Sequence, residues 1–462
     1  MEFSPSRDLS RRKFIGACCS AVGATGMLSA LAQLRLIGAA ANPSGDYKAL
    51  VCLFLAGGND ANNLIIPNDT AGFASYTAAR GALALPQSAL LGIDPLTSDG
   101  REWALHAATP QLRNFFAAGK LAFLANVGTL VVPTTKAQYD ARSVPLPPQL
   151  FSHNDQQVQW QSSVPDQPFS TGWGGRLADL TNAFNENNAI SMSITLAGQN
   201  SFQVGSTVAQ YAVNSEGVVE LSGTGGSAGA VRLDALKDLV AAQDVNLFET
   251  AFGGITSGAI NDSALLSGIL GTTAPFTTVF PDSKIGGQLR MIARLIHAAP
   301  QLGLKRQIFF ARLGGWDLHD NQVTAGATAT GAHADLLSDI SASLEAFYNA
   351  TVELGLSDKV TTYTASDFGR TYNTNGDGSD HGWGSHHIVI GGAVHGGDIY
   401  GVMPDLTING TDDTGRGRWI PTTSVDEYAA TLARWFGVSD LDLPLVLPNI
   451  GRFAQPNLGF MV

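Results

Sequence analysis

The chain has 462 residues, of which 44% are hydrophobic and 14% are charged, with 52 glycines and a formal net charge of -12. This composition is sufficient for a large hydrophobic core and excludes a coiled coil or a disordered chain. No part of the chain is basic enough to follow a phosphate backbone, so we expect no nucleic-acid partner.

The first 41 residues have the order of an export signal: a basic segment, a mildly apolar run and small residues before a cleavage point. The basic segment contains SRRKFI at residues 10–15, which resembles a twin-arginine signal. Glycine, serine and Arg35 interrupt the apolar run, which makes it a poor membrane span. We therefore expect the twin-arginine machinery to export the chain to the periplasm or the medium, with no membrane span in the mature part, residues 42–462.

Short apolar, β-branched runs alternate with amphipathic helical patterns through the mature part. The predicted strands are 49–56, 121–128, 189–197, 306–313, 359–365 and 387–394, and the clearest helices are 109–119, 286–299 and 334–355. This alternation predicts an α/β fold, a mostly parallel sheet with helices on both faces. A Gly/Ser-rich stretch followed by a long helical pattern, at about 200–280, is interpreted as a cap insertion in a single domain.

An aspartate follows each of three predicted strands: Asp60, Asp317 and Asp367. Ligands of open α/β sheets bind at the carboxyl ends of the strands, so the three carboxylates could converge there. Three like charges cannot share a dry pocket, and a divalent metal ion such as zinc, manganese or calcium would remove their repulsion. For each aspartate taken alone, a helix N-cap is the alternative role.

Four of the nine histidines lie in one glycine-rich loop at residues 381–395. Two of them, His381 and His386, would complete the metal site together with His319, which follows a strand-end aspartate by two residues. His386 and His387 are neighbours in a predicted strand and point to opposite faces, so only one of them can face the site. We interpret His386 as that residue.

Several segments carry a resemblance to a known family: LFLAGGNDANNLIIP, GGWDLHDN, SDFGRT, DHGWGSHHIVIGGAVHGGDIYG and IPTTSVDEYAATLARWFGV. Over nearly the whole mature part, the chain resembles a family of twin-arginine-exported bacterial proteins described as a domain of unknown function. That family is grouped with the alkaline phosphatase and sulfatase superfamily. The resemblance implies an alkaline-phosphatase-like fold and an exported metal-dependent hydrolase that acts on a small anionic phosphate or sulfate ester.

The resemblance also implies roles for single residues. The implied metal ligands are Asp60, Asp317, His319, Asp367 and either His381 or His386. The implied nucleophile lies near a helix start, where Ser152 is the candidate and His153 is a ligand or an acid/base. Phe368 stands where related phosphatases have a second histidine, and no sulfatase C/S-x-P-x-R motif surrounds Ser152, which favours a single metal or a changed pair.

Arg370 has two alternative roles, either to hold an anionic ester oxygen through two hydrogen bonds or to orient Asp367 by a salt bridge. Asn63 would donate to the same oxygen or stabilise its turn. Two other functions stay open. One is a non-catalytic envelope or secreted protein that keeps the fold and a structural metal. The other is a serine esterase centred on Ser227, in a G-x-S-x-G match that requires a strand directly before it and a helix directly after it.

Overall fold

The structure is a computed structural model that describes residues 46–186, 190–218, 223–224, 226–241 and 247–462. The chain divides into two compact units, 1–44 and 45–462, and all described residues belong to the second. The predicted export signal, residues 1–41, lies outside the described residues. Within the described ranges, no helix combines the length and the apolar composition that crossing a bilayer requires.

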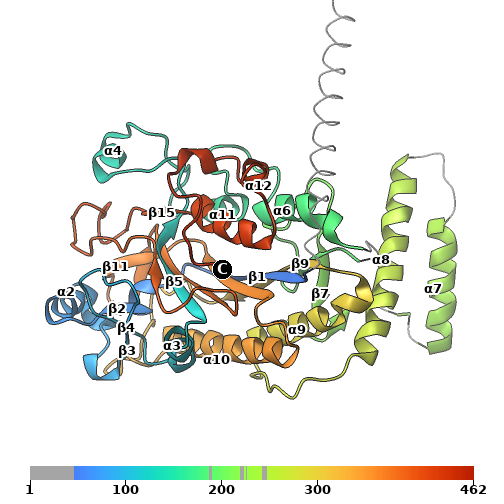
Figure 1. The fold of residues 1–462 in the computed structure, drawn as a ribbon, viewed down its shortest axis with the longest axis horizontal. Coiled ribbons are helices and arrows are strands. Elements are labelled where there is room, and N and C mark those ends of the chain that lie inside the picture. The colour runs from blue at the N-terminus through green and yellow to red at the C-terminus, as the bar shows by residue number, and fades with distance from the viewer. Residues whose placement is uncertain (1–45, 187–189, 219–222, 225, 242–246) are drawn as a thin grey trace, which may run out of the picture. The chain divides into compact units, whose positions relative to one another are not determined.

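A ten-stranded sheet forms the centre of the described part (Figure 1). Its strands lie in the order β14 (Ile399–Tyr400), β5 (Leu121–Gly128), β13 (Ser385–Gly391), β10 (Val360–Ser366), β1 (Lys48–Ala56), β9 (Arg306–Gly314), β6 (Ser193–Thr195), β7 (Tyr211–Asn214) and β8 (Gly217–Val218), and β15 (Thr423–Ser424) pairs with β5. Most pairs are parallel, but β13 runs antiparallel to both β5 and β10, and β8 runs antiparallel to β7. The prediction of a mostly parallel sheet is confirmed.

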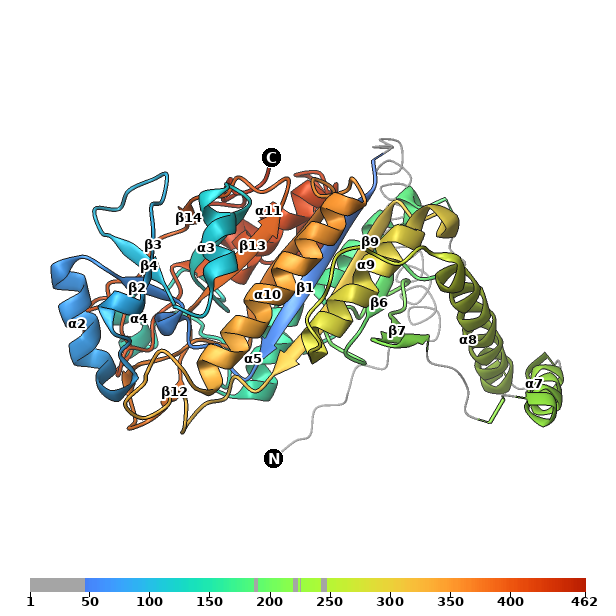
Figure 2. The ribbon, with the colours of Figure 1, turned by 90° about the horizontal axis from the view of Figure 1, so that it is seen from below.

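Helices cover both faces of this sheet (Figures 1 and 2). One face carries α3 (Pro110–Ala117), α9 (Lys284–Leu302) and α10 (Ala332–Glu353), and the other carries α5 (His153–Ser162), α6 (Trp173–Thr181), α11 (Val425–Phe436) and α12 (Leu443–Val446). The central strands are apolar on both sides because neither side meets water, and every residue of β1 from Ala49 to Ala56 is buried.

Smaller elements extend from the two edges of the sheet. Beyond β7 and β8, the segment interpreted as an insertion contains α7 (Gly226–Ala241) and α8 (Leu247–Thr272), and α8 packs on α9. Elsewhere lie α2 (Thr70–Arg80), α4 (Lys136–Ala141), a small sheet of β2 (Ile65–Pro67), β4 (Trp103–Leu105) and β3 (Leu91–Ile93), and the hairpin β11 (Arg370–Thr374) and β12 (Ser379–His381). The hairpin follows β10 directly, with only residues 367–369 between β10 and β11.

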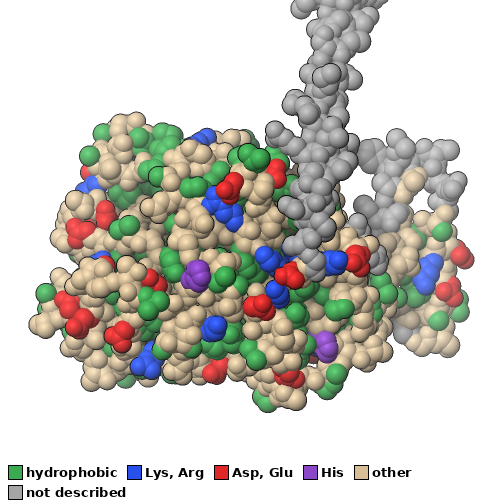
Figure 3. All heavy atoms as spheres, in the orientation of Figure 1, with side chains coloured by type: hydrophobic (Ala, Val, Ile, Leu, Met, Phe, Trp, Pro, Cys, Tyr) green, Lys and Arg blue, Asp and Glu red, His purple; other side chains and the backbone are tan. Residues whose placement is uncertain are grey.

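The surface carries both signs of charge. On the face shown in Figure 3, acidic and basic side chains are interspersed among apolar and uncharged ones, and the described residues of this face form no broad basic patch.

Candidate metal centre

The carboxyl ends of β10, β1 and β9 lie side by side, because these strands are neighbours in the sheet and run parallel. Asp60, Asp317 and Asp367 follow these three ends. Their carboxylates do not converge on one point. Asp317 and Asp367 both contact His153, whereas Asp60 is bound elsewhere.

His153, the first residue of α5, connects two of the strand-end carboxylates. Its Nδ1 lies 2.6 Å from Asp367 Oδ2, and its Nε2 lies 3.3 Å from Asp317 Oδ2. Asp367 is fully buried and also accepts hydrogen bonds from Gly57 N at 3.2 Å and Gln157 Nε2 at 2.8 Å. The hydrogen bond to Asp367 raises the pKa of His153 above its ordinary value. This contact keeps the Nδ1 proton on the side of Asp367 and leaves Nε2 directed at Asp317.

Two more imidazoles approach the other oxygen of Asp317. His319 Nε2 lies 3.1 Å and His381 Nε2 lies 3.3 Å from Asp317 Oδ1, and the two Nε2 atoms are 2.9 Å apart. On the far side of each ring, His381 Nδ1 lies 2.7 Å from the Phe151 carbonyl oxygen and His319 Nδ1 lies 3.3 Å from Asp380 Oδ1. All three imidazoles of the site therefore have an oxygen acceptor at Nδ1.

This arrangement fits a bound divalent ion. An oxygen acceptor at Nδ1 favours the neutral tautomer with its proton there, which leaves a lone pair on Nε2. Two such lone pairs 2.9 Å apart, beside a carboxylate, repel each other unless a proton or a metal ion lies between them. Metal-binding histidines typically donate their second N–H to a carboxylate or a carbonyl. Ligand atoms of His153, Asp317 and His381 all lie within 4.8 Å of one another, so these residues could hold a metal ion.

The protonation of His381 suits this role. Burial lowers the pKa of His381 below its ordinary value, and the positive charge of Arg370 lowers it further, against the effect of the Phe151 carbonyl. The ring is therefore neutral near pH 7, with its Nε2 lone pair available.

Arg370, the first residue of β11, is bound to Asp317 and not to Asp367. Its side chain is fully buried, and Nη1 donates to Asp317 Oδ1 at 2.7 Å and to the Gly57 carbonyl at 3.2 Å. Burial opposes ionisation of Asp317, but Arg370 outweighs this effect and holds the pKa of that carboxyl below its ordinary value. Gly57 has φ +124°, and a Cβ atom there would lie 2.5 Å from the Asp317 nitrogen, so only glycine allows this close approach.

Asp60 and Asn63 belong to a separate buried network. Asp60 Oδ2 forms an ion pair with Arg80 and accepts a hydrogen bond from Gln322 Nε2 at 2.5 Å. Burial opposes ionisation of Asp60, but the charge of Arg80 outweighs it and keeps the pKa low. Asn63 Oδ1 accepts from Arg80 Nε at 3.1 Å and from the Tyr76 hydroxyl at 2.8 Å. The structure thus places Asn63 as a support of its own turn.

His386 and His387 form contacts outside the cluster. His386 Nδ1 accepts from Asn126 N at 3.0 Å, and burial lowers the pKa of His386 to about 4. His387 packs edge-on against Trp160, with its Nδ1 3.3 Å from Thr364 Oγ1, and burial lowers its pKa to about 3. Both rings are neutral packing residues in this arrangement.

Ser152 is the N-cap of α5, and both of its chain neighbours contact the site. Its hydroxyl donates to Asp155 Oδ2 at 2.6 Å. Phe151 has φ 73°, a left-handed conformation that strains a bulky residue and turns its carbonyl toward His381. Ser152 therefore lies between Phe151, whose carbonyl contacts the imidazole of His381, and His153, which is itself an imidazole of the cluster.

Gln157, Asp380 and Arg80 belong to these networks but are not among the candidate residues that the sequence patterns indicate. Gln157 lies one helical turn after His153, so both side chains share a face of α5. This spacing indicates that Gln157 can reach the carboxylate that His153 contacts, which is Asp367. Asp380 directly precedes His381 in the histidine loop and was also within reach of sequence reasoning. Arg80 lies far from the loop and carries no local signal.

Comparisons with known proteins place the chain in a family. Similar solved structures include the PsFucS1 sulfatase from Pseudoalteromonas sp. (TM-score 0.36, 11% identity, covering 88% of this chain and 72% of that chain). They also include the C-terminal periplasmic domain of EcEptC from Escherichia coli in complex with Zn (TM-score 0.34, 10% identity, 91% and 93%) and the lipoteichoic acid synthase LtaP from Listeria monocytogenes (TM-score 0.32, 9% identity, 88% and 76%). No curated protein matches the chain. The model of the family described as "Protein of unknown function (DUF1501)" matches residues 47–418, and the chain belongs to that family.

Proposed function

We propose that the chain is an exported metal-dependent hydrolase of phosphate or sulfate esters. The observation that carries the proposal is the common orientation of three imidazoles. His153, His319 and His381 each have an oxygen at Nδ1 and direct Nε2 at Asp317. The basic motif at residues 10–15 supports export by the twin-arginine machinery.

The resident ion would be held by His153, Asp317 and His381, with His319 beside them. Zinc–ligand bonds of about 2.0–2.2 Å in a tetrahedral site place the ligands roughly 3.3–3.6 Å apart. His153 Nε2 lies 3.3 Å from Asp317 Oδ2, and His381 Nε2 lies 3.3 Å from Asp317 Oδ1. Both separations are close to this spacing. Imidazole ligands favour zinc over manganese and calcium, which prefer oxygen ligands. When bound, the ion would act as a Lewis acid on the ester oxygen.

The residues around the ion would carry out the transfer. Ser152 Oγ would attack the phosphorus or sulfur atom, forming a new bond as the bond to the leaving alcohol breaks. Its proton would pass to Asp155, whose Oδ2 already accepts the hydrogen bond of that hydroxyl at 2.6 Å. The leaving alkoxide would take a proton from water, and a second water would hydrolyse the ester on Ser152. Arg370 would keep Asp317 in place for the ion.

A non-catalytic envelope protein with a structural metal is the second candidate. The contact between Ser152 and Asp155 favours it, because a serine at the start of a helix and an acid in its first turn also form an ordinary helix terminus. The esterase alternative has less support. Ser227 is an exposed residue in the first turn of α7, and the preceding described strand, β8, ends at Val218 and not directly before it.

One set of measurements on the purified protein separates these functions. Metal content is measured by elemental analysis, and hydrolysis of aryl phosphate and aryl sulfate is followed before and after chelation. The proposal predicts bound metal, activity that chelation removes and readdition of metal restores, and loss of that activity in Ser152→Ala with the metal retained. Metal without activity supports the structural role. Activity that resists chelation and disappears in Ser227→Ala supports the esterase. Protein without metal overturns the proposal.

A further inference from the structure

Arg80, the last residue of α2, is a fully buried cation whose guanidinium is surrounded by oxygen atoms. Its Nη2 contacts Asp60, its Nε donates to Asn63 Oδ1 at 3.1 Å, and its Nη1 donates to the carbonyls of Thr371 and Tyr372 at 3.0 and 3.1 Å. An unpaired buried charge is costly, so this complete set of partners fixes the side chain in one position.

Two chains of contacts lead from this position to Arg370. The first is short, because the carbonyls of Thr371 and Tyr372 directly follow Arg370 on β11. Arg80 therefore holds the strand that begins with Arg370.

The second chain passes through Asp60. Gln322 Nε2 donates to Asp60 Oδ2 at 2.5 Å, and Gln322 Oε1 accepts from Ser379 Oγ at 2.8 Å. The Ser379 carbonyl in turn accepts from Arg370 Nη2. In addition, Asn62 Nδ2 donates to the Arg370 carbonyl at 2.9 Å. Both the backbone and the guanidinium of Arg370 are thus oriented from the Asp60 side.

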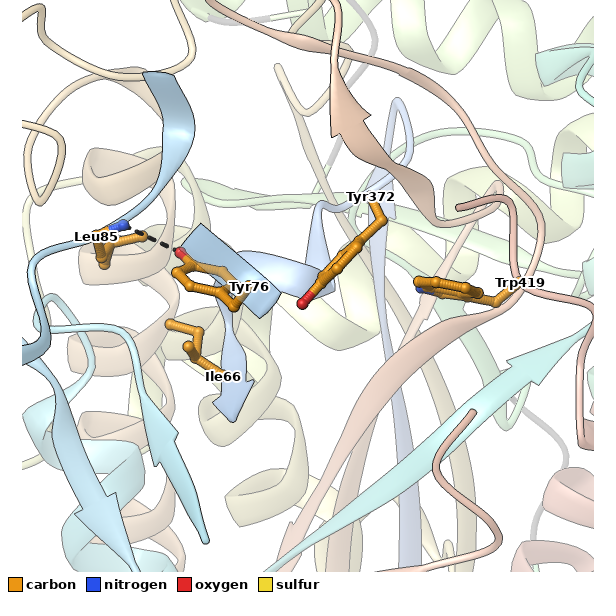
Figure 4. Packing of buried hydrophobic residues seen from close by; sticks show 5 residues of the cluster. All are labelled: Ile66, Tyr76, Leu85, Tyr372 and Trp419. Atoms are coloured by element: carbon orange, nitrogen blue, oxygen red, sulfur yellow. Dashed lines mark hydrogen bonds between the residues drawn. The ribbon is translucent and has the colours of Figure 1, made fainter. Parts of the chain in front are cut away.

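Aromatic packing keeps α2 against β11 around these contacts (Figure 4). The buried cluster contains Ile66, Tyr76, Leu85, Tyr372 and Trp419, and the Leu85 nitrogen donates to the Tyr76 hydroxyl at 3.1 Å. The ring centroids of Tyr372 and Trp419 are 5.3 Å apart. This packing holds the end of α2, and with it Arg80, in place against β11.

We propose that Arg80 is a positioning residue of the metal centre. It orients Arg370, and Arg370 holds Asp317 Oδ1 through the hydrogen bond of 2.7 Å, so Arg80 controls metal affinity without contacting the ion. This inference depends on the proposed function, because it assumes that Asp317 binds a metal. Partners that orient a ligand typically change metal affinity by about 10–100-fold when they are removed.

The test measures Zn²⁺ affinity by competition with a chromogenic chelator in Arg80→Met, Arg370→Met and the double variant. We expect each single variant to bind Zn²⁺ about 10–100-fold more weakly. If Arg80 acts through Arg370, the double variant binds no more weakly than Arg370→Met alone. Additive losses, or unchanged affinity in Arg80→Met, overturn the inference.

Arg306→Met is the matched control for general destabilisation. Arg306 is also fully buried and donates to backbone carbonyls, including Phe436 O at 2.9 Å, but it lies at the amino end of β9, away from the site. The Arg306→Met variant should have a lower unfolding temperature and an unchanged Zn²⁺ affinity. A loss of Zn²⁺ affinity in Arg306→Met as large as that in Arg80→Met overturns the inference. If Arg80→Met does not fold, Arg80→Lys takes its place in the same cycle. Absence of Zn²⁺ binding in the unmodified protein overturns the proposed function itself, which distinguishes the two failures.

Discussion

Asp426 provides a stability test that is independent of the metal centre. This residue, in the first turn of α11, is 1% exposed, and its Oδ1 has no hydrogen-bond partner within the described ranges. Burial raises the pKa of Asp426 from 3.8 to about 7, against the opposing effects of the Ser163 hydroxyl and the positive charge of Arg176, and with a further contribution from Glu427. Replacement by asparagine keeps the shape of the side chain and removes its ionisation.

The sign and size of the effect follow from this shift. Because the folded pKa of Asp426 lies above the unfolded one, its contribution to stability is complete below about pH 4 and is lost as the pH rises through 7. A shift of about three units corresponds to an upper limit of about 4 kcal/mol. We expect Asp426→Asn to be more stable than the unmodified protein by roughly 1–2 kcal/mol at pH 5 and by up to about 4 kcal/mol at pH 8.

Urea unfolding at several pH values measures this difference, and comparison of the two proteins cancels the other titrating groups. Asp413→Asn is a contrasting control. Asp413 is also fully buried, but its carboxylate accepts backbone hydrogen bonds from Asn409, Gly415, Gly417 and Arg418, so this change should destabilise the protein at pH 8. The reasoning about Asp426 is refuted if Asp426→Asn gives no gain at pH 8 or a gain that is constant with pH.

Two further predictions concern the site and its supporting turn. His153→Ala should weaken Zn²⁺ binding by more than about 100-fold, whereas His386→Ala should leave the affinity unchanged, and equal affinities by chelator competition would contradict the assignment of ligands. Gly57→Ala should lower the free energy of unfolding by about 2–4 kcal/mol, because its left-handed backbone and the nearby Asp317 nitrogen leave no room for a Cβ atom. Gly92→Ala is the control, because no atom lies within 4 Å of the added Cβ. Similar urea midpoints for the two variants would contradict the expected strain at residue 57.

The placement of the site could be predicted from the sequence because it depends on local pattern and strand direction. Apolar runs identified the strands, and the parallel pairing of β1 with β9 and β10 brought the segments of Asp60, Asp317 and Asp367 to one edge. The histidine loop reaches the same edge because β13 is antiparallel to β10. Reversal of one strand puts its amino end beside the carboxyl ends of its neighbours.

The individual partners could not be predicted, because they depend on contacts between distant segments. Strict alternation predicted that either His386 or His387 would face the site, but the register of β13 against β5 shifts between Ser385 and His387. That irregularity has no signature in the sequence. Likewise, nothing near Asp60 indicates that Arg80 lies against it, since the pair forms only when α2 packs on β11.

These contacts change the reason for expecting a metal ion. In the sequence, three clustered carboxylates required an external cation, but the fold supplies a partner to each: Arg80 to Asp60, Arg370 to Asp317 and His153 to Asp367. The carboxylates alone therefore no longer demand an ion. The expectation of an ion now depends on the imidazoles, because His319 and His381 bring two Nε2 atoms within 2.9 Å of each other beside Asp317 while each Nδ1 is directed at an oxygen, and a proton or a metal ion must lie between the two nitrogens. A single ion bound by nitrogen and oxygen would satisfy these lone pairs and would leave the ion pair of Arg80 with Asp60 intact.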